Sequence, residues 1–298
     1  MVDMGMSMKW TCKTVLDWTI AYLKHQGDDH PRLSAEWLLS SATGLSRIEL
    51  YTNFDRPLTQ FELNAMHQAV KRRASGEPLQ YVTGEMPFRH IVLRCEQGVL
   101  IPRPETELLV DAVLEGLPQE QGKPVPALVL EIGCGTGCIA CSLAHERAKT
   151  HVVATDISSA AVRLATRNRN ALGLQAAVDI VACNLADGVD PRLMGNFDAL
   201  VSNPPYIPTA VLSTLPHEVS GFEPQLALDG GTDGLDVYRR ILALAAQALL
   251  PGALFAVELF ETKLERAAQL ARDQGGWSSV EISKDYTHRP RFLIARRA

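Results

Sequence analysis

The stretch ALVLEIGCGTGC, residues 127–138, decides the fold class of this chain. Its first half is an apolar run that predicts a buried strand, and its second half is a glycine-rich turn. Gly133, Gly135 and Gly137 let the backbone approach a ligand closely without a side-chain clash. Further apolar runs follow at residues 151–155, 178–182, 197–202 and 253–259, separated by stretches with helical patterning. Alternating strands and helices predict an α/β fold with a doubly wound parallel sheet.

The chain ahead of this region is predicted to be helical. Helical patterns occupy residues 14–27, 31–44 and 59–76. The last of them opens with Thr59 and Glu62 at the spacing of a capping box. Residues 77–108 instead carry short β-like runs between Gly and Pro residues, which predicts a linker that contains a hairpin. We therefore expect a helical substrate-docking domain over 1–76, a linker over 77–108 and the α/β domain over 109–298.

The composition is that of a soluble globular protein. Of 298 residues, 46% are hydrophobic and 21% are charged, and the formal net charge is −5. An acidic chain does not attract a phosphate backbone, so a nucleic acid is not expected as the main partner. No apolar run is long enough to span a membrane, and residues 1–10 lack the apolar core of a signal peptide. We therefore expect a cytoplasmic monomer whose cysteines are free thiols.

The residue at the end of the next predicted strand helps to identify a cofactor. Asp156 follows the glycine loop by about 20 residues, the position from which an acid binds both hydroxyls of a ribose. A nicotinamide dinucleotide would satisfy this spacing, and so would an N-cap role for Asp156 without any ligand. However, the glycines read G-x-G-x-G and not G-x-G-x-x-G, and the preceding Glu131 offers a carboxylate to an ammonium group. S-adenosylmethionine has an ammonium and no phosphate, so it is the predicted cofactor. The residues expected to contact it are Glu131, Gly133, Gly135, Gly137 and Asp156.

Three cysteines in the same stretch raise another possibility. Cys134, Cys138 and Cys141 have the C-x3-C-x2-C spacing of radical S-adenosylmethionine enzymes. The first lies inside the glycine loop and the others lie on the following helix, so a cluster and a nucleotide loop cannot both form there. Buried thiols on a packed helix are the simpler interpretation, and no metal is predicted.

A second motif, VSNPPYIP at residues 201–208, follows a predicted strand. Its prolines fix two φ angles and remove two backbone donors, so Asn203 lies on a stiff hairpin. The Asn203 side-chain oxygen and the Pro204 carbonyl would hold the two N–H groups of a planar amino group. Pro205 keeps these acceptors rigid, and Tyr206 packs on the flat acceptor group. We predict methyl transfer to such a group, with all four residues, Asn203 to Tyr206, in catalytic and substrate-binding roles. The alternative is an asparagine that caps a proline-rich turn.

Four segments, taken together, indicate a protein family. They are EPLQYVTGE at 77–85, GVLIPRPETELLV at 98–110, VSNPPYIP at 201–208 and FEPQLALDGGTDGLDVYRRI at 222–241. This combination resembles the HemK/PrmC family of release-factor glutamine N(5)-methyltransferases. The resemblance implies a Rossmann-like, seven-stranded class I methyltransferase domain preceded by a small all-helical domain. It also implies S-adenosylmethionine as cofactor and, as substrate, the glutamine of the Gly-Gly-Gln motif in peptide chain release factors.

The resemblance adds residues to the expected site. It implies that Cys134 and Thr136 contact the cofactor together with the loop glycines, and that Asn203 contacts both cofactor and substrate. By the same resemblance, Asn184 and Leu185 border the adenine. It also implies that Arg103 and Glu105 shape the substrate side, although a proline-rich linker with an acidic helix start would explain them equally.

The sequence departs from the family pattern in three places. Asn184 stands where the family usually has an acid, Phe260 where it often has glycine, and residues 284–297 lack the usual glycine-containing turn. Two other functions therefore stay open. The NPPY hairpin also resembles that of adenine amino-group methyltransferases acting on DNA or RNA, and a catalytically silent binding protein would keep the same fold.

Overall fold

The computed structural model describes residues 9–298, which divide into two compact units. One unit extends to Gly84 and includes the later segment His217–Phe222, while the other consists of Glu85–Pro216 and Glu223–Ala298. Within the described residues, no helix combines the length and the apolar composition that crossing a membrane requires. The prediction about a signal peptide mainly concerns residues 1–8, which lie outside the described part of the chain.

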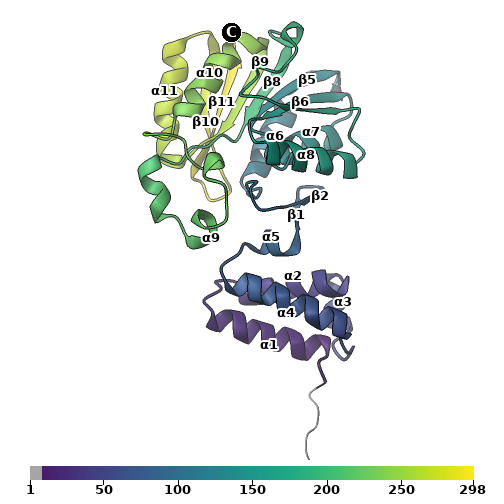
Figure 1. Ribbon diagram of the computed structural model, residues 1–298. Coiled ribbons are helices and arrows are strands. Elements are labelled where there is room, and N and C mark those ends of the chain that lie inside the picture. The colour runs from purple at the N-terminus through teal and green to yellow at the C-terminus, as the bar shows by residue number, and fades with distance from the viewer. Residues whose placement is uncertain (1–8) are drawn as a thin grey trace, which may run out of the picture. The chain divides into compact units, whose positions relative to one another are not determined.

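The first unit is helical (Figure 1). Its helices are α1 (Cys12–His25), α2 (Pro31–Thr43), α3 (Arg47–Thr52), α4 (Gln60–Ala74) and α5 (Leu79–Thr83), with α9 (His217–Ser220) from the later segment. The three predicted helical patterns correspond to α1, α2 and α4. The predicted capping box also forms, because Thr59 Oγ1 accepts from Glu62 N while the Glu62 carboxylate accepts from Thr59 N. Apolar side chains from these helices, among them Leu16, Leu39 and Val70, make one buried cluster.

Helix α5 lies where the sequence predicts a β-like run inside a linker. The Pro78 carbonyl accepts from Tyr81 N and Val82 N, which closes a helical turn, and Gly84 ends that turn at φ 81°. The Tyr81 side chain is buried, so packing outweighs the β propensity of this short segment. The helical unit therefore extends beyond residue 76, to Gly84.

The second unit is built on a seven-stranded sheet (Figure 1). Its strands are β5 (Ala127–Ile132), β6 (Thr150–Asp156), β7 (Val178–Ala182), β8 (Phe197–Ser202), β9 (Leu249–Glu258), β10 (Trp277–Lys284) and β11 (Pro290–Arg297). Their order is β10-β11-β9-β8-β5-β6-β7, and β11 runs antiparallel to both of its neighbours. Two hairpins lie outside this sheet: β1 (Glu85–Phe88) with β2 (Ile91–Arg94), and β3 (Gln119–Glu120) with β4 (Lys123–Pro124). All five predicted strands are present in the sheet, while β10 and β11 were not among them.

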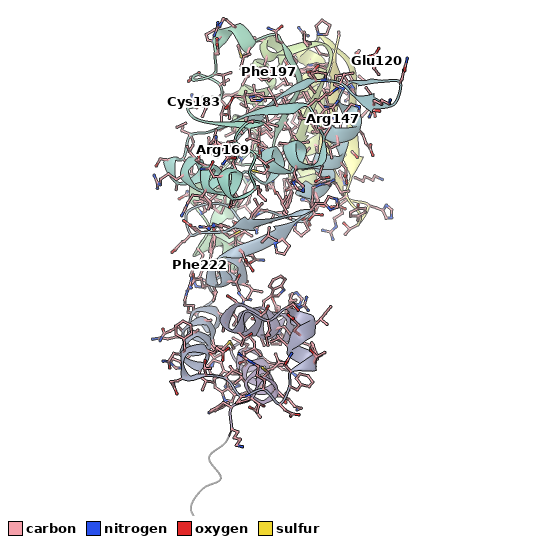
Figure 2. All side chains as sticks on the ribbon, turned by 90° about the vertical axis from the view of Figure 1, so that its right-hand side faces the viewer. Glu120, Arg147, Arg169, Cys183, Phe197 and Phe222 are labelled. Atoms are coloured by element: carbon pink, nitrogen blue, oxygen red, sulfur yellow. The ribbon has the colours of Figure 1, made fainter. Side chains whose placement is uncertain are left out.

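Helices cover both faces of the sheet. On one face lie α6 (Thr106–Gly116), α7 (Cys138–Glu146) and α8 (Ser159–Ala171), and on the other α10 (Asp236–Ala248) and α11 (Leu264–Gln274). Short 3-10 turns connect them: η1 (Pro191–Leu193), η2 (Thr209–Thr214), η3 (Gln225–Ala227) and η4 (Glu261–Lys263). Successive residues of β5 alternate between the faces, with Val129 in the cluster of α6–α8 and Leu130 in that of α10 and α11. The second cluster includes Phe197, which is labelled in Figure 2 and is fully buried. Burial on both faces explains why the inner strands, such as β5 and β8, are nearly continuous apolar runs in the sequence.

The strand order places the two sequence motifs side by side. Strand β5 lies between β6 and β8 in parallel register, with Ile132 opposite both Thr155 and Ser202. The glycine loop after β5 and the NPPY hairpin after β8 therefore leave the same edge of the sheet. The chain order reverses between these two strands, and ligands of open α/β sheets bind at such a point.

Candidate active site

A cavity of about 220 Å³ opens at this edge of the sheet. It is lined by the loops after β5, β6, β7 and β8 and by residues from 98–100 and 224–240. Of the predicted site residues, it brings together Gly133, Gly135, Asp156, Asn184, Leu185, Asn203 and Pro205. The others, Glu131, Cys134, Thr136, Gly137, Pro204, Tyr206, Arg103 and Glu105, do not line it.

The backbone N–H groups of Gly133, Cys134 and Gly135 in the glycine loop are bonded inside the protein. Gly133 N and Cys134 N donate to the Thr155 carbonyl at 2.8 and 2.9 Å, and Gly135 N donates to Asp156 Oδ2 at 2.9 Å. A loop that binds a pyrophosphate points such groups at its ligand. The arrangement therefore disfavours a dinucleotide and agrees with a cofactor that has no phosphate.

Glycine is required in this loop for two different reasons. Gly133 and Gly135 have φ of 76° and 55°, and a Cβ on either would meet no atom within 4 Å, so the backbone conformation alone demands glycine. A Cβ on Gly137 would lie 3.3 Å from the Cβ of Ala165. There the missing side chain allows α7 and α8 to pack closely, which is a structural role.

Asp156 occupies the end of β6 and faces the cavity. Its Oδ1 accepts from Ser158 N at 2.8 Å and its Oδ2 from Gly135 N, and burial raises the pKa of the carboxyl. The N-cap of α8 is Ser158, which accepts from Ala161 N, so the alternative interpretation of Asp156 as the helix cap is wrong. The next residue, Ile157, is 61% exposed although it is apolar, and it also lines the cavity. The sequence interpretation missed Ile157, for which an apolar residue directly after the acid at a strand end was the available signal.

Glu131 lies on the face of the sheet that α7 covers. Its Oε2 accepts from Ala140 N in the first turn of α7 at 2.9 Å, and its Oε1 has no partner in the described chain. Burial raises the pKa of this carboxyl well above its ordinary value. The side chain thus binds a helix N-terminus directly, and it does not reach the cavity where an ammonium group was expected.

The three clustered cysteines are core residues. Cys134, Cys138 and Cys141 belong to the apolar cluster between the sheet and α6–α8, and burial raises the pKa of each thiol. Within residues 9–298, no group of three or more His, Cys, Asp or Glu side chains is arranged to hold a metal ion.

Asn184 has both ends of its amide occupied by neighbours. Its Oδ1 accepts from Arg240 Nη2 at 2.9 Å, and its Nδ2 donates to Asp187 Oδ2 at 3.1 Å. Arg240 comes from α10 and lines the cavity. Cys183, which precedes Asn184 and is labelled in Figure 2, also lines it. Arg240 lies in the segment 222–241 that carries the resemblance, but nothing in the sequence pairs it with Asn184, because only the fold brings α10 to this loop.

The NPPY hairpin presents two acceptors. Asn203 Nδ2 donates to Thr106 Oγ1 at 3.2 Å, so the amide oxygen Oδ1 is turned the other way. Within residues 9–298, no group donates a hydrogen bond to Asn203 Oδ1 or to the Pro204 carbonyl. Polar acceptors near a protein interior normally have a hydrogen-bond partner. Since these two have none in the described chain, both are free to accept hydrogen bonds from a ligand.

The segment 228–234 clamps the exit of this hairpin. Ile207 N donates to the Leu228 carbonyl at 2.9 Å, and Gly230 N donates to the Ile207 carbonyl at 2.8 Å. A Cβ on Gly230 would lie 2.7 Å from Tyr206 Cα, and one on Gly234 would collide with the Tyr206 carbonyl oxygen. Gly230 and Gly234 of LDGGTDG are therefore needed for close approach to the hairpin, and this contact adds rigidity to that supplied by the prolines.

Tyr206 continues into an aromatic surface. Its ring stacks on Phe260, with centroids 6.5 Å apart and planes inclined by 16°, and Phe260 is 38% exposed. Its hydroxyl lies 3.5 Å from Glu258 Oε1, and burial together with this carboxylate raises the pKa of Tyr206. The departure from glycine at Phe260 thus adds an exposed ring next to the hairpin.

Arg103 and Glu105 are not among the residues that line the cavity. Arg103 Nη2 donates to both carboxylate oxygens of the buried Glu223, at 2.8 and 2.6 Å. Glu105 stands at the N-cap position of α6 without a capping hydrogen bond from its side chain. Their predicted part in substrate binding remains a prediction.

The residues around the cavity fit S-adenosylmethionine. Asp156 presents a carboxylate beside the apolar Ile157, which suits a ribose and a flat base, and the loop glycines leave open space over the end of β5. Among the described residues that line the cavity, Arg240 carries the positive charge. Its guanidinium already donates to Asn184 Oδ1, so this donor is not free for a phosphate ligand. The site therefore suits a cationic sulfonium compound better than a pyrophosphate.

Comparison with known proteins agrees with this geometry. Residues 14–84 match the PrmC N-terminal domain, and residues 106–214 match the methyltransferase small domain. The release factor glutamine methyltransferase of Geobacter sulfurreducens is 45% identical over 250 residues, which cover 84% of each chain. That of Moorella thermoacetica is 41% identical and covers 96% of this chain and 99% of its own. That of Rhodopirellula baltica is 36% identical over the whole of both chains.

Solved structures support the fold alone. A methyltransferase from Pyrococcus furiosus is 21% identical, with a TM-score of 0.50, and the match covers 68% of this chain and 87% of that one. A human methyltransferase 10 domain containing protein is 18% identical, also with a TM-score of 0.50, covering 67% and 84%. The predicted Rossmann-like methyltransferase fold and its cofactor, S-adenosylmethionine, are confirmed. The chain is therefore an S-adenosylmethionine-dependent methyltransferase and belongs to the release factor glutamine methyltransferase family.

Proposed function

We propose that this chain transfers a methyl group to the side-chain amide nitrogen of the glutamine in the Gly-Gly-Gln motif of peptide chain release factors. The observation that carries the proposal is the pair of available acceptors, Asn203 Oδ1 and the Pro204 carbonyl, beside the cofactor cavity. A primary amide has two N–H donors in one plane, which match two acceptors on adjacent residues. The names of relatives that cover most or all of the chain support a release factor as the substrate.

The chain contributes to the reaction mainly by positioning. An amide nitrogen is a poor nucleophile, because its lone pair is delocalised into the carbonyl group. When bound, S-adenosylmethionine supplies an electrophilic methyl group on its sulfonium sulfur. Asn203 Oδ1 and the Pro204 carbonyl each accept one N–H of the glutamine, which orients the nitrogen toward the cavity. They would also stabilise the positive charge that develops on nitrogen as the C–N bond forms and the bond between the methyl carbon and sulfur breaks, with its electron pair left on sulfur. The nitrogen becomes acidic only then and would release one proton to solvent, so the site needs no strong base beforehand.

The cofactor would be held by groups on three strand ends. Asp156 would accept hydrogen bonds from the ribose hydroxyls, and Ile157 would pack against the base. Asn184 and Leu185 would border the adenine, and Asn203 would contact the end that carries the methyl group. The remaining predicted residues, Glu131, Cys134, Thr136 and Gly137, would act on the cofactor through the shape of the loop and of α7.

The substrate side is assigned to residues around the hairpin. Tyr206 would pack on the glutamine amide, and Phe260 would extend that aromatic surface. Arg103 and Glu105 would shape the approach of the Gly-Gly-Gln loop, and the helical unit would dock the rest of the release factor. The protein would act as a monomer in the cytoplasm, where release factors work.

Methylation of an adenine amino group is not favoured. The relatives that cover most or all of the chain are named for release factor glutamine, and the chain carries a net charge of −5. A catalytically silent protein would not need the two unpaired acceptors of the hairpin.

The proposal is tested by mixing the purified protein, S-adenosylmethionine and a release factor, and analysing the Gly-Gly-Gln peptide by mass spectrometry. One added methyl group on the glutamine is expected with the wild-type protein. Asn203→Ala should lose this product while still binding S-adenosylhomocysteine, because Asp156 and the glycine loop remain intact. An unmethylated glutamine in a reaction where cofactor binding is demonstrated would refute the release factor as substrate.

A further inference from the structure

Two residues without a role in the proposed mechanism, Thr106 and Glu258, meet directly behind Asn203. Thr106 is the first residue of α6, in the segment PRPETE, and Glu258 is the last residue of β9. Asn203 Nδ2 donates to Thr106 Oγ1 at 3.2 Å, and Thr106 Oγ1 donates to Glu258 Oε2 at 2.7 Å. Thr106 and Glu258 are each only 1% exposed, so water does not compete for these bonds.

The direction of each hydrogen bond in this chain is determined by chemistry. An ionised carboxylate can only accept, so the single proton of the Thr106 hydroxyl goes to Glu258. The Thr106 oxygen can then only accept from Asn203, and the Asn203 side chain has donors on Nδ2 alone. Nδ2 must therefore face Thr106, and Oδ1 must face away from it.

From this geometry we infer that Thr106 and Glu258 are positioning residues, which fix the Asn203 amide with its oxygen toward the substrate. The inference rests on the proposed function, because it explains how Asn203 comes to present an acceptor. With the amide turned over, Nδ2 would point its own N–H groups at the N–H groups of the glutamine. A donor would then face a donor, and one of the two positioning bonds would be lost.

The surroundings of Glu258 make a merely structural role a poor explanation. A buried carboxylate is costly, and an apolar pair of the same size would pack at this place with less penalty. The charged groups near Glu258 are Arg291 on β11, and Arg103 and Glu105 ahead of α6, with the Tyr206 hydroxyl at 3.5 Å from its Oε1. Burial raises the pKa of Glu258 to about 7, while Arg291 and Arg103 oppose this shift. Above that pH the carboxylate is ionised, and the ionised form can only accept.

The inference is tested with two substitutions of Thr106. Thr106→Val keeps the shape of the side chain and removes the hydroxyl, while Thr106→Ser keeps the hydroxyl. Thr106→Val is expected to lower kcat by about tenfold or more, with KM for the release factor and the Kd of S-adenosylhomocysteine within about threefold of wild type. Thr106→Ser should keep kcat within about threefold of wild type.

A matched control distinguishes the effect of losing the Asn203 orientation from the general effect of removing a buried hydroxyl. Ser202 precedes Asn203, is fully buried, and donates to the Ile132 carbonyl at 2.7 Å without touching the Asn203 amide. Ser202→Ala should therefore change kcat by less than about threefold. A Thr106→Val variant as active as wild type, or a Thr106→Ser variant as impaired as Thr106→Val, would overturn the inference.

A measurement on the free protein keeps the inference testable if the release factor proves not to be the substrate. In the 1H–15N spectrum, the Asn203 side-chain NH2 signals, assigned by their loss in Asn203→Ala, should show NOE contacts to the Thr106 side chain. In Thr106→Val these signals should shift toward those of a solvated amide. If wild type lacks the contacts, the orientation is wrong, whatever the substrate. If the contacts are present but no methyl transfer occurs, the proposed substrate has failed and the orientation stands.

Discussion

Asp156 Oδ2 accepts a hydrogen bond from Gly135 N at 2.9 Å, which ties the last residue of β6 to the loop that follows β5. The carboxylate therefore holds the glycine loop in shape in addition to facing the cavity. Its contribution to cofactor binding should have two parts, one from contact with the ribose and one from the fixed loop.

Asp156→Ala removes both parts at once. We expect the affinity for S-adenosylhomocysteine to fall by about tenfold or more, since a charge-assisted hydrogen bond typically contributes about 1.5–3 kcal/mol. Isothermal titration calorimetry measures this directly. Ser158→Ala is the control, because it removes the cap of α8 and leaves the carboxylate in place. Equal affinity of Asp156→Ala and wild type would contradict the assigned role of Asp156.

Gly234→Ala should disturb the hairpin from outside. The added Cβ would collide with the Tyr206 carbonyl oxygen, at a residue whose φ is 81°. Gly173→Ala is the matched control, because Gly173 has φ 71° and no atom within 4 Å of an added Cβ. We expect Gly234→Ala to lower the free energy of unfolding by about 1–3 kcal/mol more than Gly173→Ala does, as measured by urea denaturation. Equal losses would mean that the segment 228–234 does not press on the hairpin.

Glu258 should make stability depend on pH. Burial raises its pKa to about 7 from an ordinary value of 4.5, so the folded state binds this proton more tightly than the unfolded state. Between these two values the folded protein carries more protons, and the free energy of unfolding therefore falls as pH rises. The full difference is about 3 kcal/mol.

Glu258→Gln removes that titration. Urea denaturation at about pH 5 and about pH 8 should show a smaller loss of stability on raising the pH in Glu258→Gln than in wild type. Other raised carboxyls, such as Glu131, contribute equally to both proteins and cancel in the comparison. Identical pH dependence of the two proteins would show that the pKa of Glu258 is not raised in the folded state.

The same ionisation should appear in catalysis. Protonated Glu258 can donate a hydrogen bond, which frees the Thr106 hydroxyl to donate to Asn203 Oδ1 and turns the amide over. We therefore expect kcat of wild type to fall as pH drops below about 7, where the pKa of Glu258 lies. Arg291 and Arg103 hold this pKa down and Glu105 raises it, so a change at any of them should move the midpoint.

The measurement is kcat at saturating substrate from about pH 5.5 to about pH 9. Glu258→Gln should show a lower rate and lose the acid limb, because an amide does not titrate. Parallel profiles for wild type and Glu258→Gln would assign the acid limb to another group.

Local patterns in the sequence predicted most of the main sheet. The apolar runs that became β5, β6, β8 and β9 are buried on both faces, so their composition alone indicated strands. The run that became β7 lies at an edge of the sheet and is only partly buried. Strand β10 lies at the edge of the sheet and is largely exposed, so it shows no such run. The turn into β11 is organised by Asp285, whose Oδ1 accepts from Thr287 N and Arg289 N at 2.8 and 3.1 Å, in place of a glycine turn.

The site was predictable where a short contiguous motif fixes the local backbone geometry. It was not predictable where the fold brings distant segments together. The acceptors at Asn203 and Pro204 followed from the prolines and the preceding strand. In contrast, whether the Glu131 carboxylate points to the cavity or to α7 depends on which face of β5 it occupies, and that needs the packed sheet. Thr106 and Glu258 lie in segments far apart in the sequence, so only the folded chain reveals their contact.

The segment His217–Phe222 has a consequence for how this protein can be divided. Arg73 on α4 donates to Asp28 at 2.8 Å and to Glu218 at 3.0 Å, and Glu218 belongs to that segment. A fragment that stops at Gly84 would lack one of these carboxylates, and a fragment that begins at Glu85 would carry α9 without the helices it packs with. No single cut in the gene separates the two units cleanly. The helical part is therefore not a removable module. A deletion that separates it at Gly84 should destabilise both resulting fragments.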